Sequence, residues 1–322
     1  MKRLFWLDSM KAIGLFAIVS GHYTPPGYEY LYAFSVQLFF IISGFLNKRV
    51  PFDVFLKKIS RQLIIPMLIL GCISILLSNI RLFLNGSFTL TALGQSLVGM
   101  LLGQQIALGG LWFVYTLIVA KVVARLPKLY LKFIVASLFL VCAILYNQQP
   151  MHTIQNCWFN VILAYPMFFI GELASKYKTT INGFQNRLML FGMLIIGIAG
   201  VIISGIFNGP VWMYRCLYGN NLGYFLLGSL CGTLMVFAFS KLFLDKPFKL
   251  VTTISEGSII ILALHMQLVL IGLHYPVGYG YYLESALIML IFVPIIKFCQ
   301  KRLPILVGYR GVHNPTLSSA TE

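Results

Sequence analysis

The chain has 322 residues, of which 59% are hydrophobic and only 10% are charged. A soluble domain carries about 25% charged residues, so this composition excludes a water-soluble fold and indicates an integral membrane protein. The formal net charge of +16 would suggest nucleic-acid binding in a soluble protein. Here the basic residues lie mostly between apolar runs, where membrane orientation explains them, and we expect no nucleic-acid partner.

The apolar runs predict an all-α polytopic membrane protein with about ten transmembrane helices, because one span needs roughly 20 mostly apolar residues. Residues 84–109 are interrupted by glycine and glutamine, and we expect an interfacial or re-entrant segment there. These elements form one domain, residues 1–310, before a polar tail, 311–322, that we expect to be disordered. The predicted spans are 4–23, 28–46, 62–83, 110–126, 130–147, 154–174, 188–207, 219–243, 254–275 and 280–299.

The basic residues are distributed unevenly over the breaks between these spans. Most of the 24 Lys and Arg residues lie in every second break, and the intervening breaks hold few. Cytoplasmic loops of membrane proteins carry an excess of Lys and Arg, so the pattern predicts that both termini are cytoplasmic and that the number of spans is even. The basic breaks are 2–3, 48–61, 121–132, 176–187, 241–249 and 297–310.

The six cysteines are scattered, with no CxxC pair and no Cys/His cluster at metal-ligand spacing. We therefore expect no metal site and interpret the cysteines as small packing residues. The chemistry of the protein is then expected from ionisable side chains within the apolar runs.

Lys11 and His22 are the ionisable residues of interest in the first span. Eleven residues are about three helical turns, so both side chains share one face with roughly 16 Å between their backbone positions. A cation inside a membrane helix costs on the order of 2.5–3.5 kcal/mol and usually faces a cavity or a partner; Asp8 is a candidate partner. In the alternative interpretation, Lys11 reaches the inner surface and His22 is an interfacial residue. The spacing leaves both interpretations open.

The second span contains the run Phe39–Phe45, in which Ser43 and Gly44 are small residues between aromatic ones. Small residues allow close approach of membrane helices, so the run predicts a packing contact, and it is also a candidate site lining.

The segment from Asp8 and Lys11 to His22, followed by Phe39–Phe45, resembles the two signatures of the acyltransferase-3 family of membrane-bound O-acyltransferases. The resemblance covers nearly the whole chain and is strongest to stand-alone, fucose 4-O-acetylase-like enzymes. One departure is Lys11, where many relatives carry Arg, since Lys lacks the bidentate guanidinium fork. Further matching segments are Lys58-x-x-Arg61 before Pro66, Leu111–Phe113, Tyr165–Gly171 and Ile254–Ser258 leading to His265.

The resemblance implies transfer of an acyl group, usually acetyl, from cytoplasmic acetyl-CoA to a hydroxyl of a cell-surface or exopolysaccharide sugar. It implies a multi-pass protein of the bacterial cytoplasmic membrane whose partners are acyl-CoA, a polysaccharide or lipid-linked sugar, and membrane lipids. His22 is the candidate general base, because neutral imidazole suits pH 7; an acyl-histidine intermediate would use the same residue as nucleophile. Lys11 is expected to support it.

The other candidate residues follow from the same resemblance, except Glu29, which is a candidate because it lies among tyrosines at the outer ends of the first two spans; an interfacial aromatic belt also explains those tyrosines. Ser43, Trp112 and Lys11 are candidate donors to the oxyanion of the tetrahedral intermediate. Lys58 and Arg61 are candidate ligands of the CoA phosphates, although ordinary positive-inside anchoring also explains them. His265 and Glu29 are candidate substrate contacts.

Two other functions fit the same pattern of spans. A transporter or flippase of a glycan intermediate would also have short loops and few intramembrane charges, although the internal repeats common in transporters are not evident. An acyltransferase of the same family could instead take a lipid or small-molecule acceptor.

Overall fold

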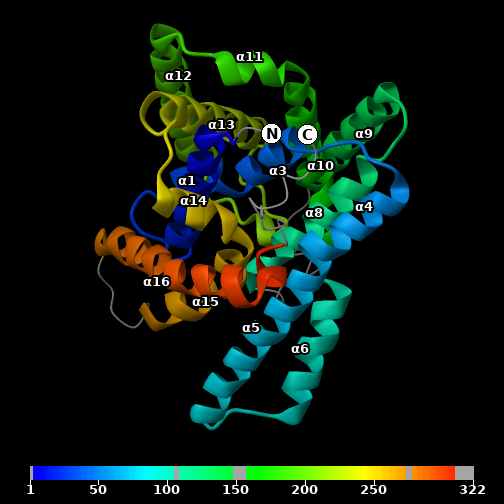
Figure 1. The fold of residues 1–322 in the computed structure, drawn as a ribbon, viewed down its shortest axis with the longest axis vertical. Coiled ribbons are helices and arrows are strands. Elements are labelled where there is room, and N and C mark those ends of the chain that lie inside the picture. The colour runs from blue at the N-terminus through cyan, green and yellow to red at the C-terminus, as the bar shows by residue number, and fades with distance from the viewer. Residues whose placement is uncertain (1–2, 105–108, 148–156, 273–277, 309–322) are drawn as a thin grey trace, which may run out of the picture.

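The computed structural model describes residues 3–104, 109–147, 157–272 and 278–308, and over these residues the regular elements are helices; an isolated bridge joins Trp212 and Leu217. This confirms the all-α part of the predicted fold class. Figure 1 shows the helices packed around α1 and α3. The α-helices are α1 (Phe5–Gly21), α2 (Tyr28–Tyr32), α3 (Ser35–Phe45), α4 (Phe52–Ile59), α5 (Ile65–Leu84), α6 (Leu90–Leu102), α8 (Trp112–Val123), α9 (Leu129–Asn147), α10 (Val161–Ala174), α11 (Lys178–Gly183), α12 (Arg187–Asn208), α13 (Leu222–Phe243), α14 (Lys249–Glu256), α15 (Ser258–Gly272) and α16 (Gly280–Arg302).

Within the described residues, six helical segments are long and apolar enough to cross a membrane, and seven if the bent pair α14–α15 counts as one span. A multi-pass membrane protein therefore accounts for the chain. The predicted number of about ten spans and the cytoplasmic position of both termini stay predictions. The six segments are Phe52–Leu84, Leu129–Asn147, Cys157–Gly183, Arg187–Asn208, Leu222–Phe243 and Gly280–Arg302.

Two predicted spans are broken in the structure. The run 28–46 forms α2 and α3, and α3 alone has 11 residues, about 16 Å at 1.5 Å per residue, shorter than the roughly 30 Å hydrocarbon core. The run 254–275 is divided at Gly257, where α14 and α15 meet at 85°. A Cβ at Gly257 would lie 2.2 Å from Cγ1 of Ile296 on α16, so the bend uses a position that only glycine fills without a shift.

The segment expected to be interfacial or re-entrant contains a regular helix. Within 84–109, α6 begins after Thr89, whose hydroxyl accepts a hydrogen bond of 3.1 Å from the backbone N–H of Ala92, the usual N-cap contact. In Figure 1, α5 and α6 form a hairpin that projects from the rest of the molecule. With 13 residues, α6 is not among the segments long enough to cross a membrane, and the interfacial or re-entrant placement of this segment stays a prediction.

The contact between α3 and α10 brings two helix backbones together. A Cβ on Gly44 would lie 1.8 Å from the carbonyl oxygen of Phe168, and a Cβ on Gly171 would lie 1.9 Å from that of Ile41. Both distances are far below van der Waals contact with a rigid backbone atom. The close approach predicted for Gly44 is confirmed, and Gly171 makes the reciprocal contact from α10.

We expect Gly171→Ala to destabilise the protein, because the added methyl group must push α10 away from α3. Overpacking of this kind costs about 1–3 kcal/mol. Gly192→Ala in α12 is the matched control, since nothing lies within 4 Å of its Cβ position and alanine has the higher helix propensity. Thermal unfolding in detergent should show a lower midpoint for Gly171→Ala and an equal or higher one for Gly192→Ala. Equal midpoints for both variants would contradict the contact.

Candidate active site

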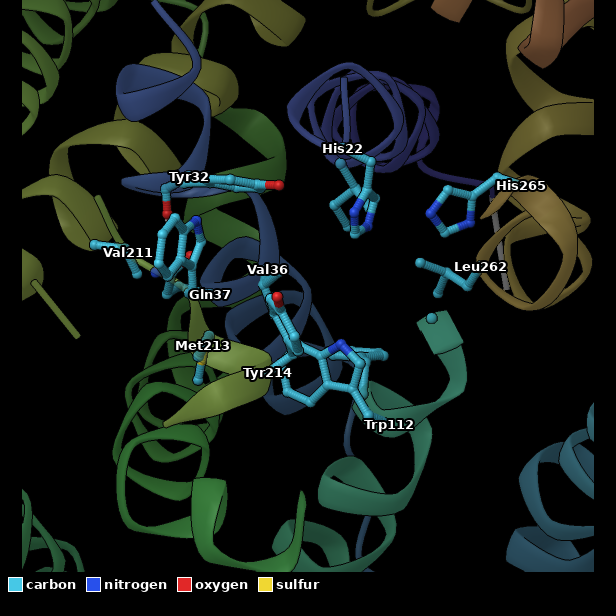
Figure 2. Close-up of a pocket in the computed structure, with 14 residues that line it drawn as sticks. His22, Tyr32, Val36, Gln37, Trp112, Val211, Met213, Tyr214, Leu262 and His265 are labelled. Atoms are coloured by element: carbon cyan, nitrogen blue, oxygen red, sulfur yellow. The ribbon is translucent and has the colours of Figure 1, made fainter. Parts of the chain in front are cut away.

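A small cavity lies where the end of α1 meets α15 and the start of α8, and we call it the histidine cavity. It has a volume of about 40 Å³, room for a few water molecules. Figure 2 shows His22 and His265 side by side on one wall, with Trp112 below them and Tyr32 and Gln37 across the cavity. The remaining lining residues are Ile18, Val36, Gly110, Phe113, Val211, Trp212, Met213, Tyr214 and Leu262.

The two imidazoles come from helices far apart in sequence. His22 is the C-cap residue of α1, and His265 lies within α15; their ring centroids are 5.0 Å apart. Nδ1 of His265 lies 2.7 Å from the carbonyl oxygen of Ile261. Because a carbonyl oxygen only accepts, Nδ1 carries the proton and Nε2 keeps its lone pair. This Nε2 is buried and has no hydrogen-bond partner among the described residues, so the cavity contains a preoriented proton acceptor beside His22.

Gly110 sets the position of Trp112 against α15. A Cβ at Gly110 would lie 2.0 Å from the carbonyl oxygen of Leu262 and 2.8 Å from Cε1 of His265. The short helical turn Gly109–Leu111 can therefore pack on α15 only with glycine at this position. It carries the chain directly into α8, whose first residue is Trp112.

Gln37 on α3 supplies a second unsatisfied polar group to the histidine cavity. Its side chain is fully buried, and its Nε2 donates to the carbonyl oxygen of Tyr32 at 3.4 Å. Its Oε1 has no donor among the described residues. A buried acceptor without a partner is costly, so Gln37 is suited to accept a hydrogen bond from a ligand hydroxyl.

A second, larger cavity of about 350 Å³ lies toward the other end of α1, and we call it the lysine cavity. Lys11, Lys58 and Lys121 line it, from α1, α4 and α8. Phe113 and Leu262 line both cavities, so these two side chains stand between the lysine and the histidine cavities. The other residues of the lysine cavity are Phe39, Ile42, Ser43, Leu46, Gln62, Leu63, Val114, Leu117, Ser255, Glu256, Ser258, Ile259, Val307 and Gly308.

One wall of the lysine cavity is held by a network of charged side chains. Arg3 Nε donates to Asp8 at 2.6 Å, and Arg3 Nη1 donates to Glu256 at 2.6 Å. The hydroxyl of Ser255 donates to the other oxygen of Asp8 at 2.6 Å, and Gln300 donates to Glu256 at 2.7 Å. Asp8, which we expected as a partner of Lys11, forms an ion pair with Arg3. Its hydrogen bond from Ser255 connects α1 to α14.

The structure brings some of the predicted site residues together and separates others. His22, Trp112 and His265 share the histidine cavity, whereas Lys11, Ser43 and Lys58 share the lysine cavity. Lys11 and Ser43 therefore lie on the far side of Phe113 from His22.

Arg61 and Glu29 are not among the residues that line either cavity. Lys58 and Arg61 are both exposed, and of these two residues Lys58 lines the lysine cavity. A π-helical turn, Ser60–Ile64, which is wider than an α-helical turn, begins between them. Pro66, which lacks an N–H, follows this turn. Glu29 lies in α2, partly exposed.

Lys121 and Gln37 are site residues that sequence reasoning missed. Lys121 was interpreted as part of a basic break, but it lies in α8 with its Nζ 5.4 Å from the Phe168 ring centroid, a cation–π distance. Its position inside the predicted span 110–126 was the available signal. Gln37 stands in the middle of the predicted span 28–46, and a polar side chain at that depth was the available signal. Among the described residues, no group of three His, Cys, Asp or Glu side chains could hold a metal ion.

Comparison with protein families gives one match. The model of the acyltransferase-3 family, described as an acyltransferase domain, matches residues 4–299. No curated protein and no solved structure matches the chain. The matched range includes every residue of both cavities except Val307 and Gly308.

Proposed function

Because the chain belongs to the acyltransferase-3 family and is a membrane acyltransferase, we propose that it moves an acetyl group from cytoplasmic acetyl-CoA to a hydroxyl of a cell-surface polysaccharide sugar. The proposed location is the bacterial cytoplasmic membrane. The family match favours this activity over transport of a glycan intermediate. A lipid or small-molecule acceptor is the alternative within the same activity.

The observation that carries the proposal is the pair of cavities meeting at Phe113 and Leu262. One is lined by three lysines and the other by two histidines. An acyltransferase that joins a charged cytoplasmic donor to an acceptor from the opposite side needs two such compartments, one cationic and one with a proton acceptor. The two side chains shared by both cavities mark the point where the acyl group would pass.

The lysine cavity suits the CoA end of the donor. Acyl-CoA carries several phosphate charges, and Lys58, Lys121 and Lys11 provide cationic donors to them. The predicted cytoplasmic break 48–61 ends beside this cavity, which agrees with entry of the donor from the cytoplasm. We assign Lys11 and Ser43 to donor binding, since the cavity that they line is separate from that of His22.

The histidine cavity suits the reacting end. A neutral imidazole takes the proton of the acceptor hydroxyl as its oxygen attacks the thioester carbonyl. The oxyanion needs a preorganised donor, and the indole N–H of Trp112 is the candidate. Collapse of the tetrahedral intermediate breaks the C–S bond, releases the CoA thiolate and leaves the acetyl ester on the acceptor.

The acceptor side of the histidine cavity carries aromatic and amide side chains. Tyr32, Trp212 and Tyr214 offer flat apolar faces, and Gln37 offers an unsatisfied acceptor. Such a set suits a sugar ring, which has apolar faces and peripheral hydroxyls. The cavity is too small for a whole sugar, so admission of the acceptor requires the lining to move.

The proposal is tested by CoA-thiol release from acetyl-CoA with purified protein and a panel of surface sugars, lipids and small alcohols. Release that depends on a sugar acceptor, with the acetyl ester found on that sugar, is the expected result. Release only with a lipid or small-molecule acceptor would support the alternative. Absence of both acetyl-CoA binding and turnover would overturn the acyltransferase proposal.

We expect Lys58→Gln and Lys121→Gln each to raise the KM for acetyl-CoA about 10-fold or more, because a charge-assisted hydrogen bond contributes about 1.5–3 kcal/mol. Arg61→Gln is the matched control, since it removes a cation of the same segment outside the cavity. Its KM should stay within about two-fold. An equal rise for Arg61→Gln would indicate general electrostatic attraction, not contact within the lysine cavity.

A further inference from the structure

A third cavity, separate from the two of the candidate active site, lies between α1, α3, α10, α11 and α13, and we call it the α11 crevice. Its volume is about 300 Å³, within the range of ligand-binding cavities. Apart from Thr233, the side chains that line it are apolar or aromatic, among them Trp6, Phe45, Ile181 and Phe237. The Thr233 hydroxyl donates within α13, to the carbonyl oxygen of Ser229. The crevice wall is therefore suited to a hydrocarbon chain.

Two cations lie at the end of the crevice that α11 covers. The Nζ of Lys178 is 5.4 Å from the ring centroid of Phe45, a lining residue, and Ile181, also lining, is one turn further along α11. Lys48 follows Phe45 by three residues, and its charge acts on Lys178. Among the described residues, no carboxylate forms an ion pair with Lys178. Two like charges near each other favour binding of an anion.

Trp6 adds an unsatisfied donor to the crevice wall. Its side chain is 4% exposed and packs edge-on against Phe45 and Phe237, with ring centroids 5.7 and 5.3 Å away. Its indole Nε1 is buried and has no acceptor among the described residues. Burying an indole N–H without an acceptor is costly, so a ligand oxygen in the crevice would relieve this cost.

These three observations describe an amphiphile: a hydrocarbon chain, an oxygen acceptor next to it and an anionic group at one end. We propose that the α11 crevice binds one acyl chain of an anionic glycerophospholipid, with its phosphate beside Lys178 and Lys48. The ester carbonyl oxygen accepts the hydrogen bond from Trp6. In Figure 1, α11 bridges α10 and α12 at one end of the molecule. The predicted orientation puts this end, within the basic break 176–187, at the cytoplasmic leaflet.

The chain of a long acyl-CoA is the other amphiphile with this chemistry. Ile42 lines both the α11 crevice and the lysine cavity, so the two spaces are neighbours. The lysines that suit CoA phosphates, Lys58 and Lys121, line the other side of Ile42, whereas the crevice has its own cations. The arrangement therefore favours a separate lipid site, and the experiment includes both ligands.

The test uses the full-length protein in nanodiscs that contain a trace of phosphatidylglycerol with a photoreactive group on one acyl chain. After illumination, adducts are mapped by mass spectrometry. We expect adducts on the crevice segments of α1, α3 and α13, and at least about five-fold fewer with a zwitterionic phosphatidylcholine probe of the same chains. Lys178→Gln should lower phosphatidylglycerol labelling to a similar extent, because its Nζ lies over the ring of the lining residue Phe45. Lys176→Gln, which removes an exposed cation two residues away, is the matched control and should not.

Thr233→Phe is a second variant, which fills the crevice without changing charge and should lower labelling by both probes. Equal labelling by the two probes, or labelling that Thr233→Phe leaves unchanged, would overturn the proposal. Preferential labelling of the same segments by a photoreactive long-chain acyl-CoA, with phosphatidylglycerol as a poor competitor, would also overturn it and assign the crevice to the donor. None of these readouts requires acetyl transfer, so the proposal and the proposed function can fail independently.

Discussion

His22→Ala is expected to lower kcat for acetyl transfer by about 10²–10⁴-fold, the range that a positioned acid–base group contributes. The KM for acetyl-CoA should change little, because the lysines assigned to CoA line the other cavity, beyond Phe113 and Leu262. The measurement is initial-rate CoA-thiol release at varied acetyl-CoA with a saturating acceptor. Loss of kcat with unchanged KM is the pattern of a group that acts mainly in the transition state.

Tyr23→Phe is the matched control for His22→Ala. Tyr23 is the next residue and is buried, but it stacks on Tyr281 with ring centroids 4.8 Å apart and does not line the histidine cavity. It should keep a wild-type kcat. If folded His22→Ala retained more than about a tenth of the wild-type kcat, the assignment of His22 to proton transfer would be wrong.

A labelled acetyl donor separates the two roles open to His22. With acetyl-CoA but no acceptor, a nucleophilic His22 would accumulate acetyl-protein and release one equivalent of thiol in a burst, whereas a general base would give neither. We expect no acetyl-protein, because the neighbouring Nε2 of His265 is an acceptor that can share the proton of the hydroxyl. Label retained on wild type and lost in His22→Ala would establish the nucleophilic role.

The fold class could be read from the sequence because a bilayer leaves a chain with few alternatives. A run of apolar residues must satisfy its backbone groups internally, so it becomes a helix. The sequence indicated less clearly where the helices break. At the bend, Gly257 packs closely against Ile296 of α16, and at the break between α2 and α3, Ala33 and Phe34 are buried. Both are tertiary effects, which the length of an apolar run does not encode.

The sequence predicted part of the candidate site, where the residues stand in local motifs, and missed the part that depends on tertiary contacts. His22 and Trp112 stand in local motifs, and the structure places them in one cavity with His265. The separation of Lys11 from His22 follows from their three-turn spacing. The sequence did not show that Lys11 and His22 line separate cavities, because Phe113 of α8 and Leu262 of α15 divide the space beside α1. The sequence also did not show that Lys58 lines the lysine cavity while Arg61 does not, because both are exposed cations of one basic break.

The second large effect is expected at His265, and amide substitutions can test which nitrogen matters. His265→Phe keeps the ring but removes both nitrogens, and we expect kcat to fall about 10–100-fold, the lower part of the acid–base range. The Nε2 lone pair has no hydrogen-bond partner within the part of the chain that the structure describes. Glutamine can place an oxygen near the position of Nε2, whereas asparagine reaches only as far as Nδ1. Consequently His265→Gln should retain more activity than His265→Asn.

If His265 had only a structural role, His265→Asn would retain as much activity as His265→Gln, or more. The hydrogen bond from Nδ1 to Ile261 lies within α15, so if it only shaped the helix, asparagine would be the better substitute. The double variant His22→Ala/His265→Phe tests whether the two imidazoles act on the same proton. Two imidazoles that act on one proton should give a double variant little worse than His22→Ala alone, since coupled groups are not additive. Losses of kcat that multiply would indicate that the two histidines, 5.0 Å apart, work independently.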